Sequence, residues 1–262
     1  MKYARSVVAE AAWVEGPHPG LRYHDLKLGT ASDGQIGARH FAADRADRSA
    51  RWDTEDEVTF ALLYVMAGSI AFGAGKDAIR LERDDCAYQD VFSGDTPAAW
   101  SENFQAFEVT VPARGAAVPP FETLRFAPGG LPTGVHPMGP DVFKPDGGPR
   151  TFFIYRDLGS AEATGGRVHI HVVRAIGAMD GGTGWHVHSM SQMFYVIAGW
   201  VDIAVDGEPP LRMTAGDAMC LAQGMRHDVV TFSPDYVVFE VCLPADYSTV
   251  ATPAPDLAGA GR

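Results

Sequence analysis

Residues 186–199 read HVHSMSQMFYVIAG, in which two histidines stand two residues apart and a glutamine follows the second one by four residues. Side chains of an extended chain alternate between two faces, so His186, His188 and Gln192 point to one side. Phe194 and Val196 continue the same face. The segment therefore predicts β structure in which two imidazoles and an amide lie next to an apolar wall.

Two imidazoles at positions i and i+2 of a strand can converge on one ion, because imidazole binds Zn, Fe, Mn, Ni and Cu. The pair alone is weak evidence, since the chain has nine histidines and a second such pair, His169 and His171. The alternative is a polar barrel interior without an ion. The context of the pair is therefore needed to choose between the two.

Segments on both sides of this stretch have counterparts about 130 residues earlier. The run from Tyr155, YRDLGSAEATGGRV, resembles YHDLKLGTASDGQI from Tyr23. FSPDYVVFEVCLPA around Phe239 resembles WSENFQAFEVTVPA around Phe107, and MFYVIAGWVDI resembles LLYVMAGSIAF. Self-similarity with a nearly constant offset indicates two copies of one structural unit.

Each copy contains short runs rich in Val, Ile, Phe and Tyr, separated by Gly, Pro, Asp or Asn. This pattern is typical of all-β barrels and sandwiches. The 29 glycines and 18 prolines in 262 residues also favour β structure over long helices. We expect an N-terminal barrel over 1–115, a linker over 116–150, a C-terminal barrel over 151–248 and a flexible tail over 249–262.

The histidine pair and its surroundings resemble the first motif of the cupin superfamily, Gly-x5-His-x-His-x3-4-Glu-x6-Gly. The spacing is kept by His186, His188, Gln192 and Gly199, with Gln in place of Glu. The opening glycine is displaced, because Gly181 and Gly182 stand beside its expected place at Asp180.

The second cupin motif, Gly-x5-Pro-x-Gly-x2-His-x3-Asn, is matched by Gly216, Gly224 and His227. Ala222 stands where Pro is expected, and Thr231 stands where Asn is expected. The resemblance implies an all-β fold of two tandem cupin (RmlC-like jelly-roll) β-barrels. It also implies a small-molecule site with a divalent metal ion on His186, His188 and His227.

Gln192 is either a fourth ligand through its amide oxygen or a hydrogen-bonding group behind the ligands. Three imidazoles and an amide are all neutral, so they would leave the full +2 charge on the ion, making it a stronger Lewis acid. Iron is the favoured metal, and zinc, manganese and nickel are the alternatives.

These features favour a metal-dependent enzyme that acts on a small oxygen-rich substrate, with an Fe(II)-type dioxygenase, an oxidoreductase, as the first hypothesis. One alternative is a Zn- or Mn-dependent isomerase or cyclase. Another is a cupin that binds a small molecule without catalysis. Fold resemblance does not choose among them, because this barrel hosts many reactions.

The first copy lacks the imidazoles. The positions of His186, His188, Gln192 and His227 correspond to Glu55, Glu57, Ala61 and Asp95. These carboxylates could bind Ca²⁺ or Mg²⁺, although solvated carboxylates are the ordinary case. We therefore expect the first barrel to be a degenerate packing partner for the second.

Further residues are candidates for a substrate pocket. Phe194 and Val196 share the inner face, Trp185 precedes the first ligand, and His169 and His171 lie on a neighbouring strand. The two histidines could act as a proton relay, a substrate contact or an extra ligand. An anionic substrate could be bound by one of Tyr155, Arg174, Arg212 and Arg226.

The formal net charge of −12 and the lack of a basic cluster argue against nucleic-acid binding. The three cysteines form no CxxC pair, which suits a reducing compartment. No stretch of the sequence is apolar enough to span a membrane or to serve as a signal peptide. We expect a cytoplasmic protein, monomeric or homodimeric.

Overall fold

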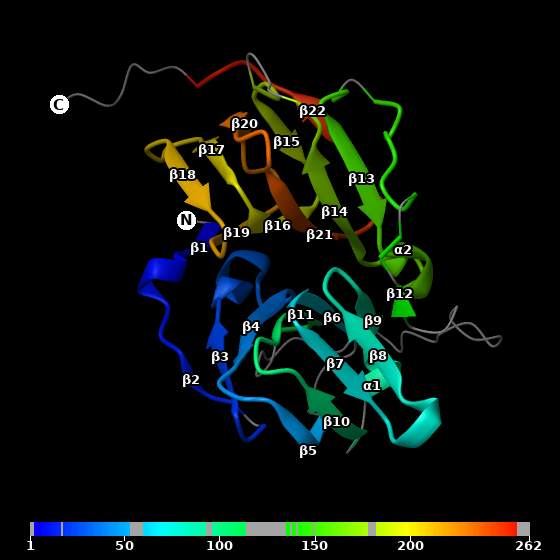
Figure 1. Cartoon of the computed structure of the whole chain (residues 1–262). Coiled ribbons are helices and arrows are strands. Elements are labelled where there is room, and N and C mark those ends of the chain that lie inside the picture. The colour runs from blue at the N-terminus through cyan, green and yellow to red at the C-terminus, as the bar shows by residue number, and fades with distance from the viewer. Residues whose placement is uncertain are drawn as a thin grey trace.

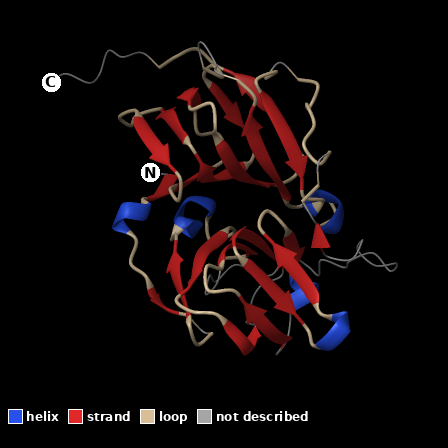
Figure 2. Ribbon diagram, viewed as in Figure 1, coloured by secondary structure: helices blue, strands red, loops and turns tan. Residues whose placement is uncertain are grey.

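The structure is a computed structural model that describes residues 3–16, 18–52, 60–92, 96–113, 135–136, 138–139, 141–148, 150–177 and 182–255. Strands dominate these residues and form two bodies, one above the other in the view of Figure 1. The helices are short (Figure 2): α1 (Gln89–Phe92), α2 (Ser160–Ala163) and the 3-10 helices Val8–Glu10, Leu28–Ser32 and Gly75–Asp77. The predicted all-β fold with two tandem barrels is confirmed.

The first barrel consists of a large and a small sheet. The seven-stranded sheet has the order β12 (Val135–His136), β9 (Cys86–Tyr88), β6 (Phe60–Ala67), β11 (Gln105–Val111), β4 (Gly37–Ala43), β3 (Leu21–Asp25) and β2 (Val14–Glu15). The four-stranded sheet has the order β5 (Asp47–Trp52), β10 (Thr96–Trp100), β7 (Ser69–Phe72) and β8 (Ile79–Glu82).

The second barrel repeats this plan. Its six-stranded sheet has the order β1 (Tyr3–Ser6), β19 (Ala218–Leu221), β16 (Ser191–Ala198), β21 (Val237–Leu243), β14 (His169–Ala175) and β13 (Phe153–Asp157). Its five-stranded sheet has the order β18 (Leu211–Thr214), β17 (Trp200–Val205), β20 (His227–Phe232), β15 (His186–His188) and β22 (Thr249–Ala251).

The ends of the chain differ from the predicted domain ranges. Strand β1 pairs with β19, so residues 3–6 belong to a sheet of the second barrel, not to a barrel over 1–115. Strand β22 pairs with β15 at the start of the predicted tail over 249–262. In both places, the chain end satisfies backbone hydrogen-bonding groups that an edge strand would otherwise leave to solvent.

The predicted linker over 116–150 also contributes to structure where it is described. Strand β12 pairs with β9, and Lys144 forms an isolated bridge with Tyr155. These contacts tie the connection between the barrels to a sheet of each one.

The described residues form three apolar cores. One lies inside the first barrel, one inside the second, and the third between the two large sheets. In the third, Tyr195 stacks on Phe107 with ring centroids 4.3 Å apart, and Phe239 meets Tyr64 at 5.5 Å. The two barrels therefore share a buried interface.

The alternation predicted for β16 is what divides these cores. Phe194 and Val196 belong to the core inside the second barrel, whereas Met193 and Tyr195 belong to the core between the barrels. Gln192 is buried on the inner face with Phe194. One strand thus supplies both the wall of the site and the interface with the first barrel.

The turn after β16 explains the motif glycine. Gly199 has a φ of 69°, and a Cβ there would clash with Ser233 Oγ. Its counterpart Gly68 has a φ of 65° and stands in the same relation to Ser101 Oγ. Both halves therefore need glycine at this position.

Candidate metal centre

Three histidines come together from two adjacent strands of the small sheet. His186 pairs with His227 in the register of β15 and β20, and His188 lies two residues further along the same face of β15. All three are buried, and one ring nitrogen of each lies within 4.8 Å of those of the other two. This is the convergence that a single metal ion requires.

The ring orientations leave Nε2 of each histidine for the centre. Nδ1 of His186 is 2.6 Å from the Gly184 carbonyl oxygen, and Nδ1 of His227 is 3.0 Å from that of Met225. Carbonyl oxygens only accept hydrogen bonds, so these Nδ1 atoms carry the protons. Nδ1 of His188 lies 2.9 Å from Thr249 Oγ1.

Two buried polar atoms at the centre, His188 Nε2 and Gln192 Oε1, have no hydrogen-bond partner among the residues that the structure describes. An unpaired buried polar atom costs about 1–3 kcal/mol, so its presence calls for a specific reason. A metal ion supplies one, because both atoms carry a lone pair suited to coordination. The residues present fit a divalent ion.

Burial keeps the three imidazoles neutral. It lowers the pKa of His188 to about 3 and that of His227 to about 4, and in each case a neighbouring imidazole lowers the pKa further. The pKa of His186 is also lowered, by burial first, against the opposing hydrogen bond to Gly184. Neutral imidazole is the form that binds metals.

The cavity in front of the three histidines is small, about 20 Å³, which is room for about one water molecule or ion. Arg150 lies on its wall, and its Nη2 donates to His186 Nε2 at 3.3 Å. Arg150 is the one guanidinium among the described residues that line this cavity. Sequence reasoning missed it, because it lies in a loop without periodic patterning.

Glu240 of β21 also lines the cavity. Its Oε2 accepts hydrogen bonds from His171 Nε2 at 2.8 Å and from Gln192 Nε2 at 3.4 Å. Burial raises the pKa of this carboxyl, but the hydrogen bond from His171 and nearby positive charge outweigh it, so the pKa lies below its usual value. Sequence reasoning missed Glu240 too, although a charged residue inside the apolar run VVFEVC was a usable signal.

Comparison with known proteins finds a family similar to part of the chain and solved structures with a similar fold. Residues 175–242 match the family model described as Cupin domain. No curated protein sequence matches the chain. Three solved structures of oxalate decarboxylase from Bacillus subtilis are similar to this chain, and each alignment covers 95% of it.

The first is a mutant altered at four consecutive residues, with a TM-score of 0.59, 13% identity and 79% of its own chain covered. The second comes from a study of the Mn(II) centres, with a TM-score of 0.58, 13% identity and 79% covered. The third was determined at pH 4.6, with a TM-score of 0.57, 14% identity and 78% covered. The chain has the bicupin fold.

The predicted pocket residues lie at different distances from the centre. Phe194 lines the cavity, and Val196 lies in the barrel core. His171 reaches the cavity only through Glu240, and His169 lies behind it, with its Nε2 2.6 Å from His171 Nδ1. Trp185 is half-buried and is not among the described residues that line the cavity.

Three of the four predicted anion-binding residues, the arginines, have other partners. Arg212 pairs with Asp202, Arg226 pairs with Asp206, and Arg174 lies over the Phe143 ring. Tyr155 packs edge-on against His171 and hydrogen-bonds with Arg150 on the wall of the cavity. These three arginines therefore do not reach the described centre.

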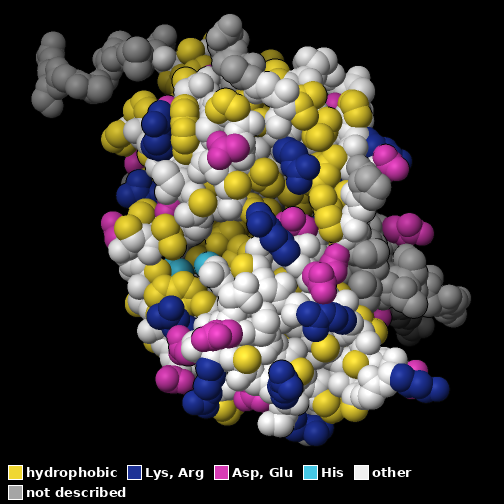
Figure 3. Space-filling view, viewed as in Figure 1, with side chains coloured by type: hydrophobic (Ala, Val, Ile, Leu, Met, Phe, Trp, Pro, Cys, Tyr) yellow, Lys and Arg dark blue, Asp and Glu magenta, His cyan; other side chains and the backbone are white. Residues whose placement is uncertain are grey.

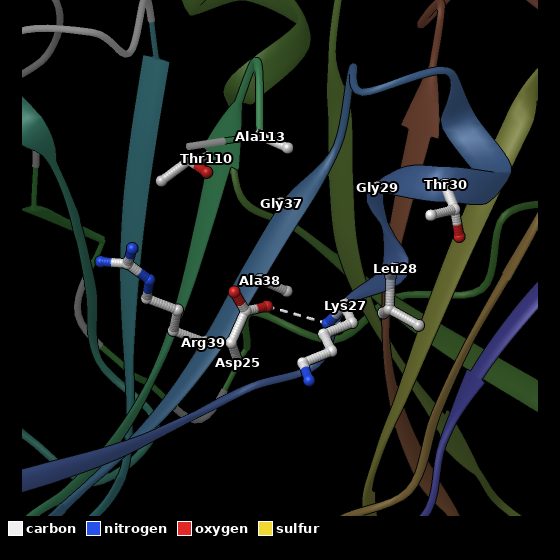
Figure 4. A pocket seen from close by; sticks show the side chains of 10 residues that line it. All are labelled: Asp25, Lys27, Leu28, Gly29, Thr30, Gly37, Ala38, Arg39, Thr110 and Ala113. Atoms are coloured by element: carbon white, nitrogen blue, oxygen red, sulfur yellow. Dashed lines mark hydrogen bonds between the residues drawn. The ribbon is translucent and has the colours of Figure 1, made fainter. Parts of the chain in front are cut away.

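A larger hollow of about 320 Å³ lies on the first barrel, where Lys27 and Arg39 are on its wall (Figure 4). None of the three centre histidines lines it. Basic and acidic side chains are interspersed over the face of the molecule seen in Figure 3. None of the helices formed by the described residues has the length and hydropathy to span a membrane.

Proposed function

We propose that the second barrel binds one divalent metal ion and uses it to activate a small, oxygen-rich anionic substrate. The observation that carries this proposal is the pair of unpartnered buried atoms, His188 Nε2 and Gln192 Oε1, beside three convergent imidazoles. Nε2 of His186, His188 and His227 would hold the ion, with Gln192 Oε1 as the fourth ligand. A bound ion would act as a Lewis acid towards substrate oxygen atoms.

Arg150 supports the anionic character of the substrate. In this structure its guanidinium donates to His186 Nε2, a lone pair that a ligand to a metal cannot share. Release from this contact would leave a cation at the mouth of the cavity, where it would bind a carboxylate or enolate oxygen. The small cavity indicates that this arginine must move for substrate to enter.

Manganese is our first choice of metal, ahead of the iron favoured by the sequence. One of the similar structures comes from work on the Mn(II) centres of Bacillus subtilis oxalate decarboxylase. The amide of Gln192 also fits this choice, since neutral ligands stabilise a higher oxidation state less well than a carboxylate does. We therefore favour a lyase or isomerase, in which the ion acts as a Lewis acid, over the predicted dioxygenase.

The test begins with the metal content of untagged protein, followed by loading with Mn²⁺, Fe²⁺, Zn²⁺ or Ni²⁺. Each loaded form is then offered small dicarboxylates, 2-oxo acids and 1,3-diketones, with O₂ uptake, CO₂ release and loss of substrate recorded. We expect turnover with Mn²⁺ and no O₂ consumption. O₂ uptake with Fe²⁺ alone would restore the dioxygenase hypothesis, and no metal binding would overturn the proposal.

The variant Arg150→Gln distinguishes the binding of metal from the binding of substrate. We expect it to bind metal at least as tightly as the native protein, because a positive charge next to a divalent ion is removed. Binding of an anionic substrate should weaken. Metal affinity falling together with substrate affinity would contradict the role assigned to Arg150.

A further inference from the structure

Glu240 is placed to control the amide of Gln192. Strand β21 lies between β14 and β16, and Glu240 pairs in register with His171 on one side and with Phe194 on the other. Gln192 is two residues before Phe194 on the inner face of β16. Glu240 and Gln192 are therefore diagonal neighbours across a strand pair, a separation that long side chains bridge.

Donor and acceptor in the contact between Glu240 and Gln192 are fixed by their chemistry. An ionised carboxylate only accepts hydrogen bonds, and Glu240 Oε2 receives one from Gln192 Nε2 at 3.4 Å. The NH2 group of the amide is thereby held towards Glu240. Its oxygen is the atom left without a partner at the centre.

This orientation matters because an amide has two different ends. Its oxygen can coordinate a metal ion, whereas its NH2 group has no lone pair available for coordination. A glutamate in this position would offer an oxygen in either orientation, but Gln192 offers one only when its NH2 group points away. A fixed acceptor behind the amide removes this ambiguity.

Glu240 is itself held from behind. His171 Nε2 lies 2.8 Å from its Oε2, and His171 Nδ1 lies 2.6 Å from His169 Nε2. His169 Nδ1 lies 3.9 Å from a carboxylate oxygen of Asp157, whose side chain is exposed. The hydrogen-bonded side chains from His169 to Gln192 thus fix the carboxylate on the cavity side of the sheet.

We propose that Glu240 is a positioning residue, which orients Gln192 so that its amide oxygen faces the three imidazoles. It also places a negative charge behind the centre, in partial compensation for the carboxylate that Gln192 replaces. This inference rests on the proposed function, because it assigns a role towards the same metal ion. It further gives His169 and His171 a task in holding Glu240.

The first barrel supplies a matched control. Glu108 occupies the position of Glu240 in the repeat and is also buried, at 1% exposure. Ala61 stands at the position of Gln192, and Arg39 stands at that of His171. Glu108→Gln therefore removes an equivalent buried carboxylate without touching the proposed metal centre.

The experiment is a Mn²⁺ titration of the full chain, followed by the EPR signal of the free ion. It compares native protein, Glu240→Gln, Glu108→Gln and the exchange variant Gln192→Glu with Glu240→Gln. We expect Glu240→Gln to weaken binding about 10- to 100-fold, as loss of a group that orients a ligand typically does. Glu108→Gln should bind like the native protein.

The exchange variant should recover most of the lost affinity, because it moves the carboxylate to position 192 and leaves an amide behind it to donate a hydrogen bond. A purely structural role of Glu240 would not be rescued in this way. If Glu240→Gln is not recovered folded, Glu240→Asp, which withdraws the carboxylate by one methylene, is titrated instead. Native affinity in the Glu240 variant would overturn the inference, whereas native protein that binds no metal would overturn the proposed function itself.

Discussion

Ala61 in β6 of the first barrel and Gln192 in β16 of the second occupy equivalent positions, and both are buried. Around Ala61 the interior is filled by aromatic rings: Trp52 lies against Phe72 and Phe92, at centroid distances of 5.8 and 6.3 Å. Around Gln192 there are three imidazoles and a cavity of about 20 Å³. The same strand plan thus holds an apolar core in one copy and a polar centre in the other.

The difference shows that the barrel does not require the centre in order to fold. A filled interior gains stability from buried apolar area, whereas unpaired buried polar atoms oppose it. In the second barrel, two such atoms, His188 Nε2 and Gln192 Oε1, lie beside three convergent imidazoles, so a metal ion is the simplest physical reason for them. The first barrel covers the large sheet of the second through the shared core that contains Phe107 and Tyr195.

The largest expected effect is on metal content, and it should differ between a histidine of the second barrel and one of the first. His227→Ala should abolish stoichiometric binding of divalent metal, because it removes one of three convergent ligands. His40→Gln removes a buried histidine of the first barrel and should leave metal content unchanged. Metal analysis of both purified variants checks this prediction, and equal losses would mean that the two barrels do not differ as described.

Trp52→Ala tests the filled interior of the first barrel. Truncation of a fully buried aromatic residue typically lowers the free energy of unfolding by about 3–5 kcal/mol. We expect that loss in chemical denaturation, with metal affinity close to native. A variant with native stability would show that the Trp52 ring contributes little to the first core.

His40 lies where the barrels meet, with Nδ1 3.2 Å from Tyr195 Oη and Nε2 3.2 Å from Gln105 Oε1. Burial lowers its pKa to about 4, against an opposing hydrogen bond with Gln105. The unfolded chain, with a histidine pKa of about 6.5, therefore takes up the proton first as the pH falls. The stability that comes from burying a neutral His40 is complete above a pH of about 6.5 and is lost as the pH falls towards 4.

The expected loss is at most about 3 kcal/mol over that range. His40→Gln should have a flatter dependence of unfolding free energy on pH than native protein between pH of about 4 and about 6.5. Denaturation curves at several pH values check the difference. Parallel pH dependence of the two proteins would show that His40 does not titrate as described.

The smallest effect concerns β22, which has no described counterpart at the matching edge strand of the first barrel. Thr249→Val removes the hydroxyl next to His188 Nδ1 and should weaken metal binding about 10-fold. Thr252→Val is the control, since its Oγ1 has no hydrogen-bond partner within the described part of the chain. Both variants are titrated with Mn²⁺. Equal Mn²⁺ affinities of the two variants would refute a role of β22 in metal binding.

Much of the candidate site followed from local sequence. His186 and His188 share a face of β15 through the period of a strand, and His227 follows Gly216 and Gly224 at the spacing of a known motif. Gln192 also follows at a motif spacing, but it lies on β16 in the other sheet of the barrel, so the period of one strand does not place it beside the histidines. The repeat was visible as matching strings, so the two barrels could be predicted as well. These features need only the order of neighbouring residues.

What could not be predicted depends on pairing between distant segments. Glu240 reaches Gln192 only because β21 lies between β14 and β16, and β1 joins the second barrel across more than half of the chain. Arg150 lies in a loop, where side-chain direction has no period to follow. The acidic positions Glu55, Glu57 and Asp95 lie outside the described residues, so the Ca²⁺ or Mg²⁺ alternative stays a prediction.

The most direct test of the central claim is a crystal structure of the Mn²⁺-loaded protein with anomalous scattering recorded for manganese. We predict one peak in the second barrel, within bonding distance of Nε2 of His186, His188 and His227 and of Gln192 Oε1, and none inside the first. A peak elsewhere, or an amide nitrogen of Gln192 facing the ion, would contradict the account.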